Sequence, residues 1–243
     1  RADATVTHEL LTEPWLRAHN PTNYARLADG QHRQNVRASG CTYEAMVEVM
    51  RADYAHTARP FFFSKELSCY FDSSAFDDAA LRDFDHVFLV RDPHATLASF
   101  YRVGVKGAAT LTTSYYDDRE AGFVESLALY RRVRRAGART LVLDADDELM
   151  RDPELTLRRF CTFARVPFDA RMLAWERAAP PEWSKFRGWH DDVAMSTRFD
   201  ATLGGARSKV TVPAAVFAAA DALTPVYKAL HWRAERAEGG APA

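Results

Sequence analysis

The sequence predicts an α/β domain with three layers, α/β/α, around a mostly parallel central sheet. Short segments rich in valine, leucine and phenylalanine alternate with longer segments whose apolar residues recur at helical spacing. Strands that are apolar along their whole length and separated by helices are typical of a parallel sheet covered by helices on both faces.

Four segments are expected to form the strands of this sheet. They are rich in β-branched and aromatic residues and are each about one strand long: residues 4–11, 60–67, 86–90 and 139–144. Parallel sheets bind ligands at the carboxyl ends of their strands. The polar residues that end or follow these segments are therefore the first candidates for a functional site.

Helices are expected between and after the strands, in residues 42–57, 93–101, 117–136, 152–164 and 213–235. Thr42 and Asp152 are suited to cap two of them, and Gly137 is suited to end a third. Pro225 predicts an interruption or kink in the last helix. Residues 104–113 are rich in small residues and read as a loop.

Length and composition fit one large domain, which we place at residues 1–236. Residues 12–40 are polar and contain prolines and glycines, so we expect a cap or a substrate loop there. Residues 237–243 read as a disordered tail. The formal net charge of −1 leaves no general basic field, which argues against binding to nucleic acid.

The three cysteines, Cys41, Cys69 and Cys161, show no metal-type spacing and read as free thiols in a reducing compartment. No apolar run reaches the roughly 18 residues that a membrane span needs, and no signal peptide is visible. We therefore expect a cytoplasmic protein that does not bind membranes. A homodimer is compatible with the sequence.

The segment from His86 to Arg102 joins a buried strand to a helix. Arg91 follows the strand directly, Pro93 can open the helix, and Ser99 lies two turns into it. A guanidinium can hold a phosphate through two N–H groups, and a hydroxyl can donate one further bond. The spacing of eight residues brings Arg91 and Ser99 within reach of one anion.

This segment, Val90-Arg91-Asp92-Pro93 leading to Ser99, resembles the 3′-phosphate-binding motif of sulfotransferases. In that family an arginine at a strand end and a serine eight positions later hold the 3′-phosphate of 3′-phosphoadenosine 5′-phosphosulfate (PAPS). The resemblance implies the P-loop nucleotide-hydrolase-like fold in its sulfotransferase form, with Arg91 and Ser99 on the cofactor. The alternative is that Arg91 pairs with a structural carboxylate and that Ser99 lies on the helix surface.

Two further segments extend the resemblance over residues 4–199. Residues 141–168 look like the strand, acidic turn and helix that follow in this family, with Asp146 and Asp147 holding the turn. Residues 183–199 resemble a bacterial and plant subgroup of sulfotransferase-like proteins. Some of its members are labelled by resemblance to branched-chain aminotransferases, but the sequence shows no sign of pyridoxal chemistry.

The resemblance also implies a basic stretch that closes over the nucleotide. The candidates are Lys185, Arg187, Arg207 and Lys209. Their match to the Gly-rich closing sequence of the family is poor, and a solvated loop is the alternative.

The catalytic candidates lie at the ends of the first two predicted strands. Sulfuryl transfer needs a base for the acceptor hydroxyl and positive charge at the transferred group. By resemblance Glu9 is the first candidate base, His8 lies beside it, Lys65 lies near the transferred group, and Glu66 is a second candidate base. Each of them is equally suited to a structural role, as a cap, an interior histidine or an ion pair. No metal is required, and no His/Cys/Asp cluster has ligand spacing.

The loop that holds the 5′-phosphosulfate in sulfotransferases has no counterpart after any predicted strand. Residues 38–42 look superficially similar but follow no buried strand. His8-Glu9-Leu10 corresponds to the strand after this loop and its helix in the family. Either the first strand and loop lie upstream of Arg1, or the protein has lost them.

The sequence favours a PAPS-dependent sulfotransferase acting on a hydroxyl of a small-molecule acceptor by in-line transfer. The leading alternative within enzymes is an ATP-dependent P-loop small-molecule kinase. A third interpretation is a degenerate, non-catalytic domain that binds nucleotide. The acceptor is not identified by any motif.

Overall fold

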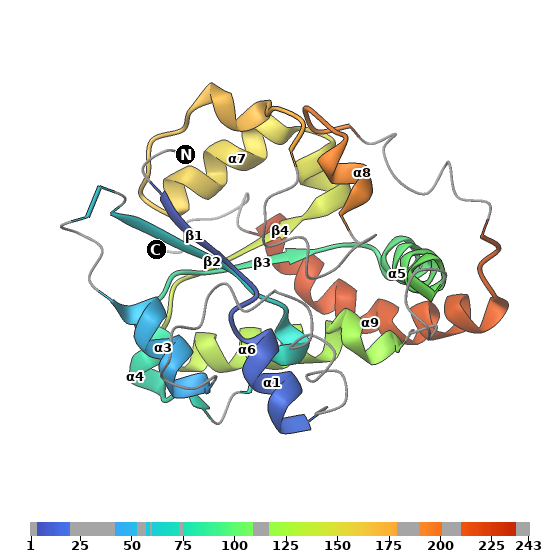
Figure 1. Cartoon of the computed structure of the whole chain (residues 1–243), viewed down its shortest axis with the longest axis horizontal. Helices are drawn as coiled ribbons and strands as arrows, with labels where there is room; N and C mark the ends of the chain where they lie inside the picture. The colour runs from blue at the N-terminus through green and yellow to red at the C-terminus, as the bar shows by residue number, and fades with distance from the viewer. Residues whose placement is uncertain are drawn as a thin grey trace.

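A computed structural model of the chain describes residues 4–19, 42–52, 57–58, 60–72, 75–108, 117–178, 190–200 and 210–236. Short parallel strands cross the middle of the molecule, and helices lie on both sides of them (Figure 1). The predicted α/β fold class is therefore confirmed.

The strands lie within the four predicted segments: β1 (Ala4–His8), β2 (Phe61–Lys65), β3 (His86–Val90) and β4 (Thr140–Asp144). The bounds of β3 agree with the prediction, and the other strands are shorter by one to three residues. The second strand is half-buried along its length rather than fully buried as expected.

The strands form two parallel pairs, β1 with β2 and β3 with β4. His8 lies opposite Lys65 in the first pair, and Val90 lies opposite Asp144 in the second. Because the strands are parallel and in register at these ends, the polar residues that end each pair of strands are neighbours in space.

A cavity of about 1340 Å³ separates the two pairs. All five residues of β2 and residues 86–89 of β3 line it, together with phenylalanines such as Phe160 and Phe163. Within the described residues, β2 pairs only with β1, and β3 pairs only with β4. Both strands therefore border this cavity, and no described strand lies between them.

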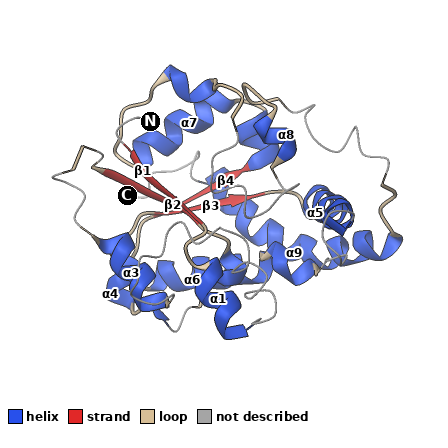
Figure 2. Ribbon diagram, viewed as in Figure 1, coloured by secondary structure: helices blue, strands red, loops and turns tan. Residues whose placement is uncertain are grey.

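The helices form two layers (Figure 2). They are α1 (Thr12–His19), α3 (Tyr43–Arg51), α4 (Asp78–Arg82), α5 (Pro93–Ala108), α6 (Phe123–Arg135), α7 (Pro153–Phe163), α8 (Asp191–Ala194) and α9 (Ala214–Arg236). Helix α7 contacts β4 from one side, while α6 and α9 contact β3 and β4 from the other. None of the helices in the described ranges is long and apolar enough to cross a membrane.

Several helix boundaries follow the sequence signals. Thr42 accepts a hydrogen bond from the backbone N–H of Ala45 at 3.2 Å and caps α3. Asp152 caps α7 through the N–H of Leu155 at 3.0 Å. Gly137 follows α6 with a left-handed φ of 81°, as expected of the residue that stops a helix.

Other boundaries differ from the predictions, because packing outweighs local composition. Residues 12–19 were expected in a loop or cap but form α1, whose Leu16 is buried. Helix α5 continues past Gly104, where a loop was expected, and Gly104 is buried. Helix α9 runs across Pro225 without the expected interruption.

The expected helix over residues 117–136 is also divided. Residues 118–121 form a 3₁₀ turn, and α6 starts only after Gly122, which has a left-handed φ of 69°. The N–H of Ser126 donates to the carbonyl of Gly122 at 2.8 Å, and the Ser68 hydroxyl donates to the same carbonyl at 2.9 Å. Gly122 therefore joins the start of α6 to the turn that follows β2.

Two apolar clusters hold the layers together. The larger one packs Met46, Leu81 and Val133 from the helices under the strands and includes Leu230 of α9. The smaller one packs Leu97 of α5 against α9. Helix α9 is thus held by both clusters, and its carboxyl-terminal half lies under the ends of β3 and β4.

We expect Gly122→Ala to destabilise the fold by about 2–4 kcal/mol, because a left-handed residue with a side chain costs about 1–2 kcal/mol and a steric clash adds to it. A Cβ at this position would lie 2.6 Å from Ser68 Oγ and 3.2 Å from the backbone N of Cys69. Urea unfolding measures the change.

Gly137→Ala is the matched control for this substitution. Its φ is also left-handed, but the nearest atom to an added Cβ, in Arg82, is 3.9 Å away. We therefore expect only the backbone cost of about 1–2 kcal/mol for Gly137→Ala. Equal losses for the two variants would contradict the role of the close approach at Gly122.

Candidate functional site

Two groups of polar side chains lie at the carboxyl ends of the parallel strands. We call His8, Glu9, Lys65 and His190 the β1–β2 cluster. The β3–β4 cluster consists of Arg91, Asp144, Asp146, Asp147, Tyr227 and His231.

Glu9 is the centre of the β1–β2 cluster. Its residue is only 6% exposed, and its carboxylate accepts a short hydrogen bond from the ammonium of Lys65. The Nε2 atom of His8 lies 3.7 Å from the same carboxylate. Two of the predicted catalytic side chains therefore contact Glu9 directly.

The backbone at Glu9 fixes the direction of this side chain. Its φ of 55° is uncommon for a residue other than glycine, and such conformations persist where the surroundings hold them. The N–H of Glu9 donates to the carbonyl of Lys65 at 2.7 Å, and its carbonyl accepts from Thr12 at 3.3 Å. The left-handed residue thus ends β1 and leads the chain into α1.

Glu66 has a different environment from Glu9. Its carboxylate accepts from the backbone N–H groups of Leu10 and Leu11 at 3.0 and 3.1 Å and from the Ser64 hydroxyl at 2.5 Å. Burial raises the pKa of Glu66 despite these bonds. Both oxygens hold the turn between β1 and α1, and this favours Glu9 over Glu66 as the base.

His190 joins the β1–β2 cluster from a segment far along the chain. Its ring lies 5.6 Å from the ring of His8 in an edge-to-face arrangement. The segment is anchored by Trp175, whose Nε1 donates to Ser196 at 3.0 Å and whose backbone N–H donates to Thr197 at 2.9 Å. No sequence motif links His190 with His8, so this contact is seen only in the structure.

The environment of His190 favours its neutral form. Burial lowers the pKa of its imidazole, and the neighbouring His8 lowers that pKa further, while Glu9 raises it. A neutral imidazole can accept a proton. The cluster thus combines a carboxylate, an ammonium and a neutral imidazole at the end of one strand pair.

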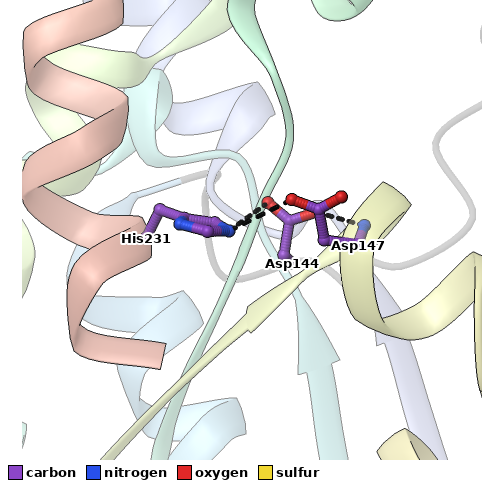
Figure 3. A group of neighbouring side chains, drawn as sticks. All are labelled: Asp144, Asp147 and His231. Atoms are coloured by element: carbon purple, nitrogen blue, oxygen red, sulfur yellow. Dashed lines mark hydrogen bonds and ion pairs between the residues drawn. The ribbon is translucent and has the colours of Figure 1, made fainter. Parts of the chain in front are cut away.

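Asp144 is the centre of the β3–β4 cluster (Figure 3). The residue is completely buried, and its carboxylate accepts from the backbone N–H groups of Asp146 and Asp147 at 2.9 and 2.7 Å. It also accepts from the Tyr227 hydroxyl at 2.8 Å. Asp146 and Asp147 were expected to hold this turn, but the side chain that holds it is that of Asp144.

His231 of α9 approaches the same two carboxylates. Its Nε2 lies 3.4 Å from Asp147 and 3.9 Å from Asp144, and Figure 3 shows the ring directed at both. The ligand atoms of these three residues all lie within 4.8 Å of one another, a grouping that the sequence spacing did not reveal. The hydrogen bonds of Asp144 and the contacts of His231 account for the close approach of these three side chains.

Arg91 lies at the end of β3, as predicted. Its Nε donates to both carboxylate oxygens of Asp146, at 3.0 and 2.9 Å, so it has a carboxylate partner in the acidic turn. Ser99 lies on α5 and is exposed, next to the buried Leu97 and Ala98. The shared phosphate site of Arg91 and Ser99 stays a prediction.

The basic residues expected to close over the nucleotide lie outside the described residues. They are Lys185, Arg187, Arg207 and Lys209. The expected tail, residues 237–243, and residues 20–40 of the expected cap lie outside them as well.

A family model described as a sulfotransferase domain matches residues 8–234. The chain belongs to this family. The match begins at His8 and ends within α9, so it contains both clusters. The family predicted from the Arg91 motif is thereby confirmed, and its parallel α/β architecture agrees with the observed strand pairs.

Relatives of this sulfotransferase-family chain include two proteins of Arabidopsis thaliana, branched-chain-amino-acid aminotransferase-like proteins 2 and 1. Each is 34% identical over 119 residues, which is 48% of this chain and 19% of the relative. The chain therefore aligns with about a fifth of the length of either relative.

Among solved structures, the sulfotransferase domain from the curacin biosynthetic pathway is similar to this chain. The alignment covers 88% of this chain and 77% of that domain, with a TM-score of 0.43 and 12% identity.

We expect the His190 imidazole to titrate below the ordinary histidine range and His8→Gln to raise its pKa, because a charged His8 disfavours a second positive charge. Histidine NMR titration measures both. His86 is the internal control, since burial also lowers its pKa but its ring bonds to the carbonyl of Leu81. An unchanged His190 titration in His8→Gln would contradict the coupling.

We expect Asp144→Ala to destabilise the fold by about 1–3 kcal/mol, because alanine removes the acceptor of all three hydrogen bonds, including those from the backbone N–H groups of Asp146 and Asp147. Tyr227→Phe removes one of these bonds and is expected to cost about 1 kcal/mol. Thermal unfolding of both variants compares the losses. A loss in Asp144→Ala no larger than that in Tyr227→Phe would contradict the role of Asp144 in holding the turn.

Proposed function

We propose that this chain transfers a sulfuryl group from PAPS to a hydroxyl of a small-molecule acceptor by in-line transfer. The observation that carries the proposal is the placement of Glu9, Lys65 and Arg91 in a sulfotransferase-family chain. They lie at the carboxyl ends of β1, β2 and β3, and they combine a carboxylate with two cations where parallel strands bind ligands. We further propose that the protein acts in the cytoplasm and needs no nucleic acid or membrane.

Arg91 fits the role of a phosphate ligand. Its side chain is 45% exposed, and Asp146 engages only its Nε atom. Of the hydrogen bonds among the described residues, none uses the two Nη atoms of Arg91. These are the donors that a guanidinium uses to hold a phosphate through two parallel bonds.

The β1–β2 cluster supplies the groups that the transfer needs. PAPS supplies the activated sulfuryl group when it is bound. Lys65 places its ammonium beside Glu9, where it can stabilise negative charge that develops on the transferred group. Glu9 accepts the proton of the acceptor hydroxyl on its carboxylate, and His8 lies next to that oxygen.

The cavity between β2 and β3 supports a proposal for where the loop that holds the 5′-phosphosulfate would lie. We propose that a further parallel strand enters this cavity between β2 and β3, whose residues line it. Its carboxyl end would then emerge between Lys65 and Arg91. A loop at that point would hold the 5′ anion through backbone N–H groups, as helix N-termini and nests do.

We expect Arg91→Ala to weaken the binding of adenosine 3′,5′-bisphosphate to the full-length protein by about 2–4 kcal/mol, through the loss of a charge-assisted contact. Isothermal titration calorimetry measures the affinity. Arg158→Ala is the control, because Arg158 forms an exposed pair with Glu154 within α7. Unchanged affinity in Arg91→Ala would contradict the assignment, and preferential binding of ATP would favour the kinase alternative.

We expect Glu9→Gln to lower turnover about 10²–10⁴-fold, the usual contribution of a general base, while donor binding stays near the wild-type level. Release of adenosine 3′,5′-bisphosphate from PAPS, with a library of hydroxyl compounds as acceptors, measures turnover. Glu13→Gln in α1 is a control with the same chemical change. A library that yields no sulfated product with the wild type would contradict the proposed activity itself.

A further inference from the structure

We propose that Asp146 is a positioning residue for the donor, which orients the Arg91 guanidinium toward the 3′-phosphate. The inference rests on the proposed function, because it names a residue that would act through Arg91. Sequence reasoning placed Asp146 only in a turn, and its contact with Arg91 is seen only in the structure.

The geometry of the contact carries the inference. Both oxygens of Asp146 accept from Nε of Arg91, at 3.0 and 2.9 Å. A guanidinium is planar and its five N–H groups have fixed directions. Fixing Nε therefore fixes the plane of the group and the direction of the two Nη atoms, which no hydrogen bond among the described residues occupies.

The exposure of the Arg91–Asp146 pair indicates that this pair orients Arg91 more than it stabilises the fold. The side chains of Arg91 and Asp146 are 45% and 37% exposed. Exposed ion pairs contribute little to the stability of a fold. An arginine side chain loses considerable rotamer freedom when it binds a ligand, and a partner that restricts it beforehand reduces this loss.

Asp146 is itself fixed to the protein core. Its backbone N–H donates to Asp144 at 2.9 Å, and the buried Asp144 accepts from Tyr227 of α9 at 2.8 Å. Figure 3 shows Asp144 at the end of its strand, between α9 and the acidic turn. A continuous series of hydrogen bonds thus runs from α9 through Asp144 and Asp146 to Arg91.

The opposite role for Asp146 would be that of a competitor, whose carboxylate must leave before a phosphate can bind. Long-range electrostatics predicts the same change in affinity as competition does, because removing a negative charge near an anion site strengthens anion binding. Both effects predict tighter binding when Asp146 is replaced by alanine. A positioning role predicts weaker binding, so the sign of the change separates the two.

The experiment measures the affinity of the full-length protein for adenosine 3′,5′-bisphosphate and for adenosine 5′-monophosphate by calorimetry. The ratio of these affinities reports the contribution of the 3′-phosphate. We expect Asp146→Ala to lower this ratio about threefold to tenfold, the range for loss of one pre-ordered side chain. Asp146→Asn keeps a carbonyl oxygen for Nε and is expected to restore part of the ratio.

Asp147→Ala is the matched control. It removes the same charge from the same turn, but its carboxylate approaches His231 instead of Arg91. We expect the ratio of the two nucleotide affinities in Asp147→Ala to equal or exceed that of the wild type. Thermal unfolding verifies that each variant is folded, since the turn is held by backbone N–H groups that these substitutions retain.

Three outcomes are decisive. A lower ratio in Asp146→Ala but not in Asp147→Ala supports the positioning role. An unchanged or higher ratio in Asp146→Ala overturns that role while leaving Arg91 as a phosphate ligand. A wild type that does not distinguish the two nucleotides overturns the proposed 3′-phosphate site, and with it this inference.

Discussion

The β3–β4 side of the molecule depends on one buried carboxylate, that of Asp144. A fully buried carboxylate is costly unless hydrogen bonds satisfy it, and here two backbone N–H groups and the Tyr227 hydroxyl do so. Satisfying this one side chain folds the acidic turn over the end of β4 and draws α9 beneath the strands. Helix α9 in turn packs against α5, so the position of the helix that carries Ser99 is linked to the same interaction.

Local signals predicted the parts of the fold in which neighbouring residues determine the conformation. The apolar run of β3, the caps at Thr42 and Asp152, and the stop at Gly137 all depend on residues within one turn of each other. The errors occur where distant residues decide. Helix α1 forms in a polar segment because Leu16 is buried, and α5 continues past Gly104 in a buried environment where local propensity favours a loop.

The candidate site was predictable to a similar extent. The ends of parallel strands mark where a ligand binds, so Glu9, Lys65 and Arg91 could be chosen before their surroundings were known. The partners of these residues could not be chosen in this way. Glu66 was the second candidate base after Glu9, and its bonds to the turn before α1 are seen only in the structure. His190 and Asp146 reach the site across long stretches of chain that no spacing rule connects.

The division of the site into two clusters has a physical cause in the arrangement of the strands. Each parallel pair aligns its own carboxyl ends, which is why Glu9 meets Lys65 and why Arg91 lies beside the acidic turn. Between the pairs, the cavity separates the edges of β2 and β3, and its apolar lining indicates that a strand suits it better than solvent does. Under the proposed function, a parallel strand in this cavity would join the two pairs into one sheet. Such a strand would also fix the distance between Lys65 and Arg91, which the proposed donor would have to span. In that proposal, the relative position of the two clusters depends on the strand between them as much as on the contacts within either cluster.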